Sequence, residues 1–427
     1  MSNEKIKVAF IGLGNRGFAH AYSCSLLKDK IEIVACADII PDKVERFAKE
    51  YGVPAEMCFE SAEQLLERER LADILFVCTM DQQHYGHSIP ALRKGYHLML
   101  EKPISNDPLE SMEIARVANE CQRHVVVCHS LRYVPHYRKI KEIMDSGELG
   151  EIMCIQANEE VCYWHQAHSF VRGNWRNSKL SSPMILQKCC HDMDMILWLT
   201  GKHCVRLSSF GSLSHLKSDK APEGAHDMCS EACPAYKDCP YSIKYYLDHI
   251  ERGTYGWPMD VVEPEMDKFK ETIKTSPYGR CAYKCDNDVV DHQVVNLLLE
   301  DDLTVTFNMC AFTSGMGGGR GIHVMGTKGD LRGSMGDPII RVNIFGKGEY
   351  QIDRSSSETD DLSHGGGDYF VVKDFVDLLE GKLNSSVSSV DKSVESHVVC
   401  MAAEKSRLEG GQVVVIDEYM KSLREGK

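Results

Sequence analysis

A glycine-rich loop near the start of the chain constrains its fold more than any other feature. Residues 12–17 are Gly-Leu-Gly-Asn-Arg-Gly, directly after an apolar run over residues 6–11 and before a stretch of helical character. Between a strand and a helix, such glycines allow a tight turn, admit a pyrophosphate and let the helix pack on the strand. A purely structural glycine turn is the alternative, but this context favours a dinucleotide site.

The N-terminal part of the chain alternates between apolar strands and helical segments. Strands are expected at residues 5–11, 31–37, 72–79, 97–100 and 125–128. This alternation predicts an α/β fold whose N-terminal domain, residues 1–128, is a doubly wound parallel sheet of the Rossmann type. We assign residues 129–427 to a second domain.

An acid at the end of the second strand indicates which dinucleotide the loop would bind. Asp38 follows Gly17 at the distance typical of a dinucleotide site, where a carboxylate can accept hydrogen bonds from ribose hydroxyls. Ile39 and Ile40 follow it and offer no cation to a 2′-phosphate. The pattern predicts NAD rather than NADP as the cofactor.

Two further segments follow strands of the same sheet. Ligands bind at the carboxyl ends of parallel strands, so residues 79–84 are expected to form a wall of the cofactor site. His84 would either contact the cofactor or cap the next helix. Lys102, within Glu101-Lys102-Pro103, follows a later strand, and a lysine beside the reactive ring can stabilise a developing alkoxide. The predicted cofactor site comprises Gly12, Gly14, Asn15, Arg16, Gly17, Asp38, Thr79, Met80, His84, Glu101 and Lys102.

A second candidate group lies on a helix predicted over residues 184–199. Gln187, His191, Asp194 and Trp198 share one face of that helix, with Lys188 at its flank. His191 near a carboxylate would be a suitable general base. The same stripe would also suit a solvated helix face.

Together these motifs resemble the glucose–fructose oxidoreductase and inositol dehydrogenase family (Gfo/Idh/MocA). The resemblance extends to Arg132-Tyr133-Val134-Pro135, Gly147-Glu148-Leu149-Gly150-Glu151, His191-Asp192-Met193-Asp194 and Gly326-Thr327-Lys328-Gly329, and covers nearly the whole chain. It implies a second domain of α/β type whose open, mostly antiparallel sheet covers the active site and often mediates oligomerisation, here as a homodimer or homotetramer. It also implies a cis peptide bond before Pro103 and favours a catalytic role for His191.

One residue departs from the family pattern. Many relatives carry an aspartate one helical turn before this histidine, whereas this chain has Gln187, which cannot ionise. Lys188 instead adds a positive charge that could stabilise an anionic substrate or lower the pKa of His191 by like-charge repulsion. The predicted catalytic set is Lys102, His191 and Lys188.

Residues 159–177 are rich in Trp, His, Arg and Asn. Aromatic faces stack on sugar rings, and the polar groups can bind hydroxyls or a carboxylate. The stretch forms either a carbohydrate site or an ordinary amphipathic loop that shields the core. In the first case the substrate-binding residues are Trp164, His165, His168, Arg172, Trp175 and Arg176, together with His191.

Residues from about 212 to 287 exceed a minimal member of the family and carry a group of cysteines. These are Cys229, Cys233, Cys239, Cys281 and Cys285. Four thiolates could hold a structural zinc ion, but the C-x3-C-x5-C spacing differs from the usual C-x2-C pairs and leaves the fourth ligand ambiguous. Plain buried thiols are the alternative, and no catalytic metal is predicted.

Composition narrows the class of protein. The net charge of −14 argues against nucleic acid and anionic membranes as partners, and no apolar run approaches the roughly 20 residues that span a bilayer. The 18 cysteines indicate reduced thiols, and the first residues carry no signal-peptide pattern, so we expect a cytoplasmic protein.

The sequence thus predicts an NAD-dependent oxidoreductase that transfers a hydride between a secondary hydroxyl of a sugar, sugar derivative or cyclitol and NAD. Two alternatives stay open. Some relatives retain NAD and cleave glycosides through a transient keto-sugar. A non-catalytic NAD-binding sensor is the other.

Overall fold

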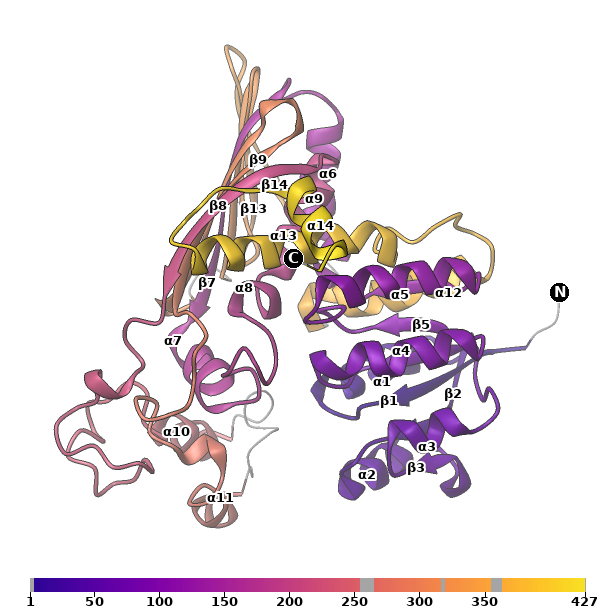
Figure 1. The fold of residues 1–427 in the computed structure, drawn as a ribbon, viewed down its shortest axis with the longest axis vertical. Helices are drawn as coiled ribbons and strands as arrows, with labels where there is room; N and C mark the ends of the chain where they lie inside the picture. The colour runs from indigo at the N-terminus through magenta and orange to yellow at the C-terminus, as the bar shows by residue number, and fades with distance from the viewer. Residues whose placement is uncertain (1–3, 254–264, 316–318, 355–362, 427) are drawn as a thin grey trace.

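The structure of the protein, a computed structural model, describes residues 4–253, 265–315, 319–354 and 363–426. The chain forms two sheets, one in each half of the molecule (Figure 1). The first sheet has six parallel strands in the order β3-β2-β1-β4-β5-β6, which confirms the predicted doubly wound fold. Its strands are β1 (Ile6–Ile11), β2 (Ile31–Ala37), β3 (Cys58–Phe59), β4 (Ile74–Val77), β5 (His97–Leu100) and β6 (Val125–Val127).

Helices cover both faces of this sheet because its central strands are apolar throughout; all four residues of β4 are buried. The connecting helices are α1 (Asn15–Ser25), α2 (Pro41–Tyr51), α3 (Ala62–Glu67), α4 (His84–Arg93) and α5 (Pro108–Glu120). A further helix, α12 (Gly367–Leu379), comes from near the end of the chain. Its Val371 and Phe375 pack into the same core as Phe10 and Phe76. The predicted domain boundary after residue 128 therefore assigns α12 to the second domain, although α12 packs in the core of the first.

The second sheet has nine strands in the order β14-β13-β12-β11-β7-β10-β9-β8-β15. Neighbouring strands are antiparallel except for β7 and β10, which run parallel. The mostly antiparallel second sheet expected from the resemblance is therefore confirmed. Its strands are β7 (Ile152–Cys162), β8 (Cys204–Ser212), β9 (His292–Leu299), β10 (Thr304–Thr313), β11 (Arg320–Gly326), β12 (Gly329–Ser334), β13 (Asp337–Ile344), β14 (Gly348–Asp353) and β15 (Val414–Val415).

One face of the second sheet packs against helices. Buried residues alternate along β10, as expected for a strand with one covered face. Met193 and Ile196 from one helix and Val398 from another join this core. The helices of this half are α6 (Pro135–Asp145), α7 (Tyr163–His165), α8 (Met184–Gln187), α9 (Cys190–Thr200), α13 (Val390–Leu408) and α14 (Ile416–Arg424). The predicted homo-oligomer stays a prediction.

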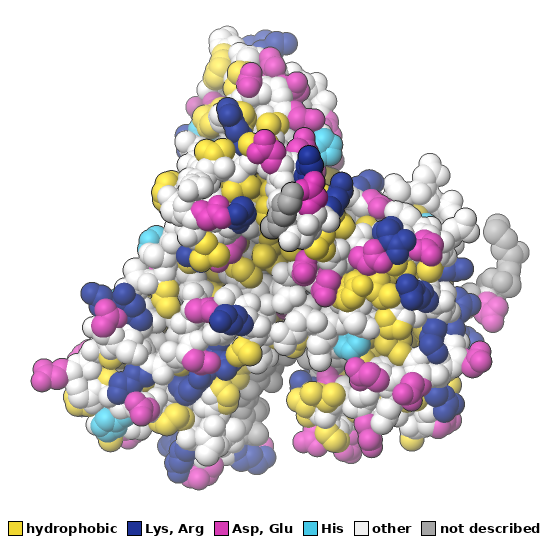
Figure 2. Space-filling model, in the orientation of Figure 1, with side chains coloured by type: hydrophobic (Ala, Val, Ile, Leu, Met, Phe, Trp, Pro, Cys, Tyr) yellow, Lys and Arg dark blue, Asp and Glu magenta, His cyan; other side chains and the backbone are white. Residues whose placement is uncertain are grey.

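The cysteine-rich insertion lies between β8 and β9 and forms an outer lobe that carries α10 (Lys244–Glu251) and α11 (Met266–Thr272) (Figure 1). Residues 254–264 of the predicted insertion lie outside the described residues. The surface is hollowed between this lobe and the first domain (Figure 2). Across the described residues, none of the helices has the length and apolar character that a membrane span requires.

Candidate active site

The glycine-rich loop has the geometry that a dinucleotide requires. Gly12 follows β1 with a φ of +85°, and a Cβ there would lie 2.5 Å from the carbonyl oxygen of Cys78. A side chain on Gly17 would overlap the carbonyl oxygen of Gly12. An added Cβ on Gly14, by contrast, would meet no atom within 4 Å. The loop is therefore tightly built at both ends and open in the middle, where a pyrophosphate would approach the backbone.

The surroundings of the loop also fit NAD. Helix α1 begins directly after Gly14 and has no side-chain cap, so the backbone N–H groups of its first turn, including those of Asn15 and Arg16, can bind an anion. The carboxylate of Asp38 accepts hydrogen bonds from the N–H groups of Leu13 (2.6 Å) and Ile40 (2.9 Å). It is half-buried and keeps lone pairs for ribose hydroxyls.

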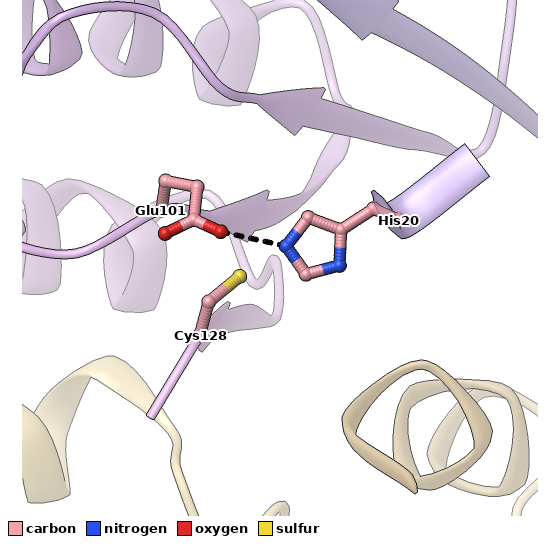
Figure 3. A group of neighbouring side chains, drawn as sticks. All are labelled: His20, Glu101 and Cys128. Carbon is pink, nitrogen blue, oxygen red and sulfur yellow. Dashed lines mark hydrogen bonds and ion pairs between the residues drawn. The ribbon is translucent and has the colours of Figure 1, made fainter. Parts of the chain in front are cut away.

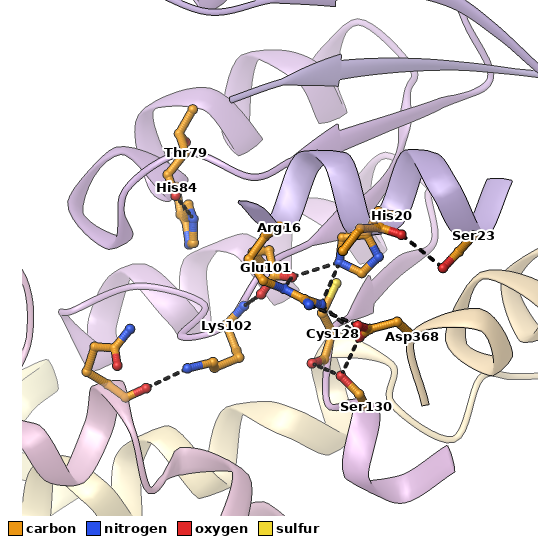
Figure 4. A network of polar contacts seen from close by, with 12 residues as sticks. Arg16, His20, Ser23, Thr79, His84, Glu101, Lys102, Cys128, Ser130 and Asp368 are labelled. Carbon is orange, nitrogen blue, oxygen red and sulfur yellow. Dashed lines mark hydrogen bonds and ion pairs between the residues drawn. The ribbon is translucent and has the colours of Figure 1, made fainter. Parts of the chain in front are cut away.

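The side chains of Arg16 and Glu101 support the site from inside the protein. Arg16 Nε lies 2.6 Å from Glu101 Oε1, and its other nitrogens donate to both carboxylate oxygens of Asp368 at 2.8 and 2.9 Å. Burial alone would raise the pKa of Glu101, but Arg16 and His20 outweigh it and hold that pKa well below its usual range. These side chains turn toward one another (Figure 4). Their direct contact with the cofactor stays a prediction.

His20, Glu101 and Cys128 form a compact buried group whose ligand-type atoms lie within 4.8 Å of one another (Figure 3). Such a trio could in principle bind a metal ion. However, the Glu101 carboxylate is already paired with Arg16 and with His20. We therefore assign this group to the support of the cofactor loop.

The loop after β4 is held by histidines. His84 lies at the start of α4, and its ring nitrogens contact the carbonyl oxygens of Thr79 (3.0 Å) and Pro103 (2.7 Å). Its side chain is thus bound to protein backbone, whereas Met80 stays half-exposed in the loop. His84 does not cap α4, and its contact with the cofactor stays a prediction. It joins this loop to the segment that carries Lys102.

Lys102 follows β5, and the peptide bond between Lys102 and Pro103 is cis, as the resemblance implied. The side chain is half-exposed, and its Nζ donates a 2.6 Å hydrogen bond to the carbonyl oxygen of Gln187 in the second domain (Figure 4). The ammonium group therefore lies where the two domains meet.

The predicted single helix over residues 184–199 is wrong. The structure has two helices, α8 and α9, separated at Lys188 and Cys189. The break places the Gln187 carbonyl at a helix end, where it can accept from Lys102. The stripe is not a solvated face, because Gln187, His191 and Asp194 are all buried.

His191 lies in the first turn of α9, against the aromatic edge of His129, with ring centroids 5.8 Å apart. The nearby carboxylate does not serve as expected. Both oxygens of Asp194 are bound by Arg132, at 2.6 and 2.7 Å. Asp194 therefore anchors α9 to the segment that follows the last strand of the first sheet.

Lys188 belongs to a buried charge cluster. Its Nζ lies 3.4 Å from Glu159 on β7, and Arg320 on β11 lies 2.8 Å from both Glu159 and Asp192. Burial lowers the pKa of Lys188 and raises the pKa of Asp192 to about 6. The sequence motifs did not point to Glu159 and Arg320, which are far apart in the chain and meet only because β7 pairs with β11.

The structure divides the predicted substrate stretch. Trp164 and His165 lie on α7, and burial followed by the charge of Lys188 lowers the pKa of His165 well below its usual value. His165 thus faces the charge cluster. Trp164 stacks on Tyr245 of the insertion, with ring centroids 5.1 Å apart.

The other four predicted substrate residues contact the protein itself. His168 and Arg172 lie on a π-helical turn (Gln166–Arg172), where His168 contacts the Tyr246 hydroxyl at 2.8 Å and Arg172 donates to the Arg280 carbonyl at 2.7 Å. Trp175 packs against the core of the second sheet, and Arg176 pairs with Asp286 at 2.7 Å. His168, Arg172 and Arg176 thus contact the insertion, and the role of these four residues in sugar binding stays a prediction.

A contact between the domains was missed altogether. Asp81, in the loop after β4, is buried and accepts hydrogen bonds from the hydroxyls of Ser181 (2.8 Å) and Ser182 (2.7 Å), just before α8. The position of Asp81 within the expected cofactor wall, residues 79–84, was the available signal in the sequence. The contact fixes the loop after β4 against the segment that leads to Gln187.

Known proteins share these features. A family model described as "Oxidoreductase family, NAD-binding Rossmann fold" matches residues 6–129, and the GFO/IDH/MocA C-terminal domain matches residues 137–231. The putative oxidoreductase YteT of Bacillus subtilis is 23% identical over 296 residues, which are 65% of this chain and 69% of that protein. Inositol 2-dehydrogenase of Corynebacterium glutamicum is 24% identical over 204 residues, 48% of this chain and only 56% of that enzyme.

Solved structures share the fold over nearly the whole chain. An inositol dehydrogenase homologue from Azotobacter vinelandii, complexed with NAD+, superposes with a TM-score of 0.70 at 17% identity, covering 96% of this chain and 97% of that one. At this identity the likeness shows the fold alone. The two family models together match just over half of the sequence. The chain therefore belongs to the Gfo/Idh/MocA oxidoreductase family, and its first domain is an NAD-binding Rossmann domain.

Proposed function

We propose that the protein is an NAD-dependent dehydrogenase that oxidises a secondary hydroxyl of a sugar, sugar derivative or cyclitol. The observation that carries the proposal is the position of Lys102. Its ammonium group follows a strand of the cofactor-binding domain and hydrogen-bonds to the helix break between α8 and α9. A substrate held by the second domain would meet the cofactor at this junction.

The roles of the residues follow from the chemistry of alcohol oxidation. Bound NAD supplies the acceptor for the hydride that leaves the carbon. The hydroxyl proton must leave as well, and a positive charge near the oxygen lowers the barrier. Lys102 provides that charge, because a substrate oxygen can replace or share its bond to the Gln187 carbonyl. His191, one turn further along, is the proposed proton acceptor.

The charge cluster supports a polar, uncharged substrate. Lys188 and Arg320 are balanced by Glu159 and Asp192. A set of polar groups whose charges largely cancel suits a polyol, whose hydroxyls can donate and accept hydrogen bonds. The similarity to an inositol 2-dehydrogenase supports the same class.

The test is NAD reduction across aldoses, uronates, glycosides and inositols, with Lys102→Met as the variant and Lys49→Met, an exposed lysine on α2, as the control. Loss of the Lys102 charge should lower kcat by about 100- to 1,000-fold while the Kd for NAD changes little. Wild-type turnover in Lys102→Met would refute the mechanism.

The panel also separates the alternatives. Release of an aglycone without net NADH would identify a glycoside-cleaving enzyme, and no relative described above favours that activity. Binding of NAD with no turnover on any substrate would favour a sensor.

A further inference from the structure

Four cysteines of the insertion gather around one small cavity. Cys229, Cys233, Cys239 and Cys281 all line it, and its volume is about 20 Å³. They come from two segments that are far apart in the chain, so only the fold of the insertion brings them together. Cys285, one turn beyond Cys281, does not line this cavity; its thiol donates to the Cys281 carbonyl instead, at 3.3 Å. Cys281, rather than Cys285, is therefore the fourth cysteine of the cavity, a choice that the spacing in the sequence did not decide.

Backbone hydrogen bonds fix the positions of these cysteines. The N–H of Cys229 donates to the Gly279 carbonyl at 2.7 Å, and the N–H of Cys281 donates to the Asp227 carbonyl at 2.8 Å. These bonds flank an antiparallel bridge between Met228 and Arg280, which brings the two cysteine-bearing segments side by side. Cys233 and Cys239 are held by turns, with N–H bonds to the Ser230 (3.0 Å) and Ala235 (2.8 Å) carbonyls.

The cavity is also suited to negatively charged sulfur. The N–H of Ile243 donates to Cys229 Sγ at 3.4 Å. The guanidinium of Arg172, only 3% exposed, lines the same cavity and donates to the backbone carbonyls of Tyr241 and Arg280, which are close in sequence to Cys239 and Cys281. Four thiolates around a divalent cation carry a net negative charge, which the buried guanidinium of Arg172 would help to balance.

We propose that Cys229, Cys233, Cys239 and Cys281 bind a single zinc ion in a tetrahedral site. Zinc–sulfur bonds of about 2.3 Å place neighbouring sulfurs about 3.8 Å apart. In the described part of the chain, no three of these sulfurs lie within 4.8 Å of one another, so the ion would draw them inward. A cavity of about 20 Å³ holds one ion or one water molecule and is too small for a polynuclear cluster.

The proposed ion would act as a structural tie for a lobe that is otherwise weakly held. Two small apolar clusters are its cores, one of them around Tyr246 and Phe269. A metal commonly replaces the missing core in such small units. Through Arg172 and the contact of His168 with Tyr246, the lobe buttresses the π-helical turn that follows His165. Loss of the ion should therefore loosen the substrate side and leave the NAD site intact.

The experiment compares wild type, Cys281→Ser and Cys285→Ser, each purified without chelator, by elemental analysis for zinc and iron and by assay for acid-labile sulfide. We expect one zinc ion per chain in the wild type and in Cys285→Ser, and a large loss in Cys281→Ser. An absence of stoichiometric metal, iron with labile sulfide, or unchanged zinc in Cys281→Ser would each overturn the proposal.

A second measurement covers the case in which Cys281→Ser fails to fold. Wild-type protein is exchanged into cobalt(II), whose tetrathiolate complex has strong absorption bands in the near ultraviolet and red. Their appearance supports four sulfur ligands, and a weak spectrum typical of oxygen ligands overturns the proposal. Neither readout depends on catalysis, so failure of the proposed dehydrogenase activity would not be confused with failure of the metal site.

Discussion

Two glycines of the same loop should respond in opposite ways to one added methyl group. Gly14 has φ −79° and ψ −170°, a conformation that alanine adopts freely, and an added Cβ would meet nothing within 4 Å. We expect Gly14→Ala to be as stable as wild type, or more stable by about 0.4–1 kcal/mol, because the unfolded chain loses freedom. In Gly17→Ala the methyl group overlaps the Gly12 carbonyl, and we expect a loss of about 1–3 kcal/mol.

The effect on cofactor binding separates stability from function. In Gly14→Ala the methyl group occupies the space in which a pyrophosphate would approach the start of α1. Displacing the phosphates weakens charge-assisted hydrogen bonds worth about 1.5–3 kcal/mol each. We therefore expect the Kd for NAD to rise by about 10- to 100-fold, which corresponds to roughly 1.4–2.7 kcal/mol.

The assay pairs isothermal titration with NAD and thermal unfolding of the unliganded proteins. The expected pattern is a stable Gly14→Ala that binds poorly and a Gly17→Ala that melts at a lower temperature. If Gly14→Ala binds NAD with the wild-type Kd, the pyrophosphate does not lie over Gly14, and the assignment of the site is refuted. If Gly14→Ala unfolds at a lower temperature than Gly17→Ala, the steric argument fails.

Three further outcomes are expected. Asp38→Gly should weaken NAD binding at least tenfold and change the affinity for NADP much less, so an unchanged preference in competition titrations would contradict the role of this carboxylate. Asp81→Ala should lower the free energy of unfolding by about 1.5–3 kcal/mol, measured in urea, because both serine hydroxyls lose a charged acceptor. Burial lowers the pKa of His168 to about 3. The neutral ring therefore makes its full contribution to the free energy of unfolding above the unfolded pKa near 6.5, and this contribution is lost as the pH falls toward 3. Between pH 7 and 5.5 the wild type should therefore lose about 1 kcal/mol more than His168→Phe, and equal pH slopes would argue that His168 is protonated in the folded state.

The sequence predicted the features that depend on residues close together in the chain. The glycine loop, the acid after β2 and the tripeptide around Lys102 each depend on neighbouring residues and on one strand end. Such short-range patterns contain most of what is needed to place the element they belong to.

Several side-chain contacts could not be predicted because the partners are far away in the chain. Arg172 lies in a stretch whose composition is typical of a ligand site, and only the folded insertion shows that its guanidinium donates to backbone carbonyls. Arg132 likewise binds Asp194, so this carboxylate is not available to His191. Arg132 and Asp194 are far apart in the chain, and the sequence alone does not pair them. The break between α8 and α9 contains no proline or glycine, so no local signal in the sequence predicts it. At this break the Gln187 carbonyl accepts a hydrogen bond from Lys102.

The position of α12 has a consequence for how the protein is made. During synthesis the strands of the first domain leave the ribosome long before residues 367–379, which pack beside Phe10 and Phe76. At about 5–20 residues per second, the emerging domain waits roughly 10 to 50 s for this helix. Throughout that interval the part of the sheet face that α12 later covers stays open to water and to chaperones, while α1 and α2 can already cover the rest. Maturation of the NAD-binding half is therefore governed by completion of the polypeptide, although that half is translated first.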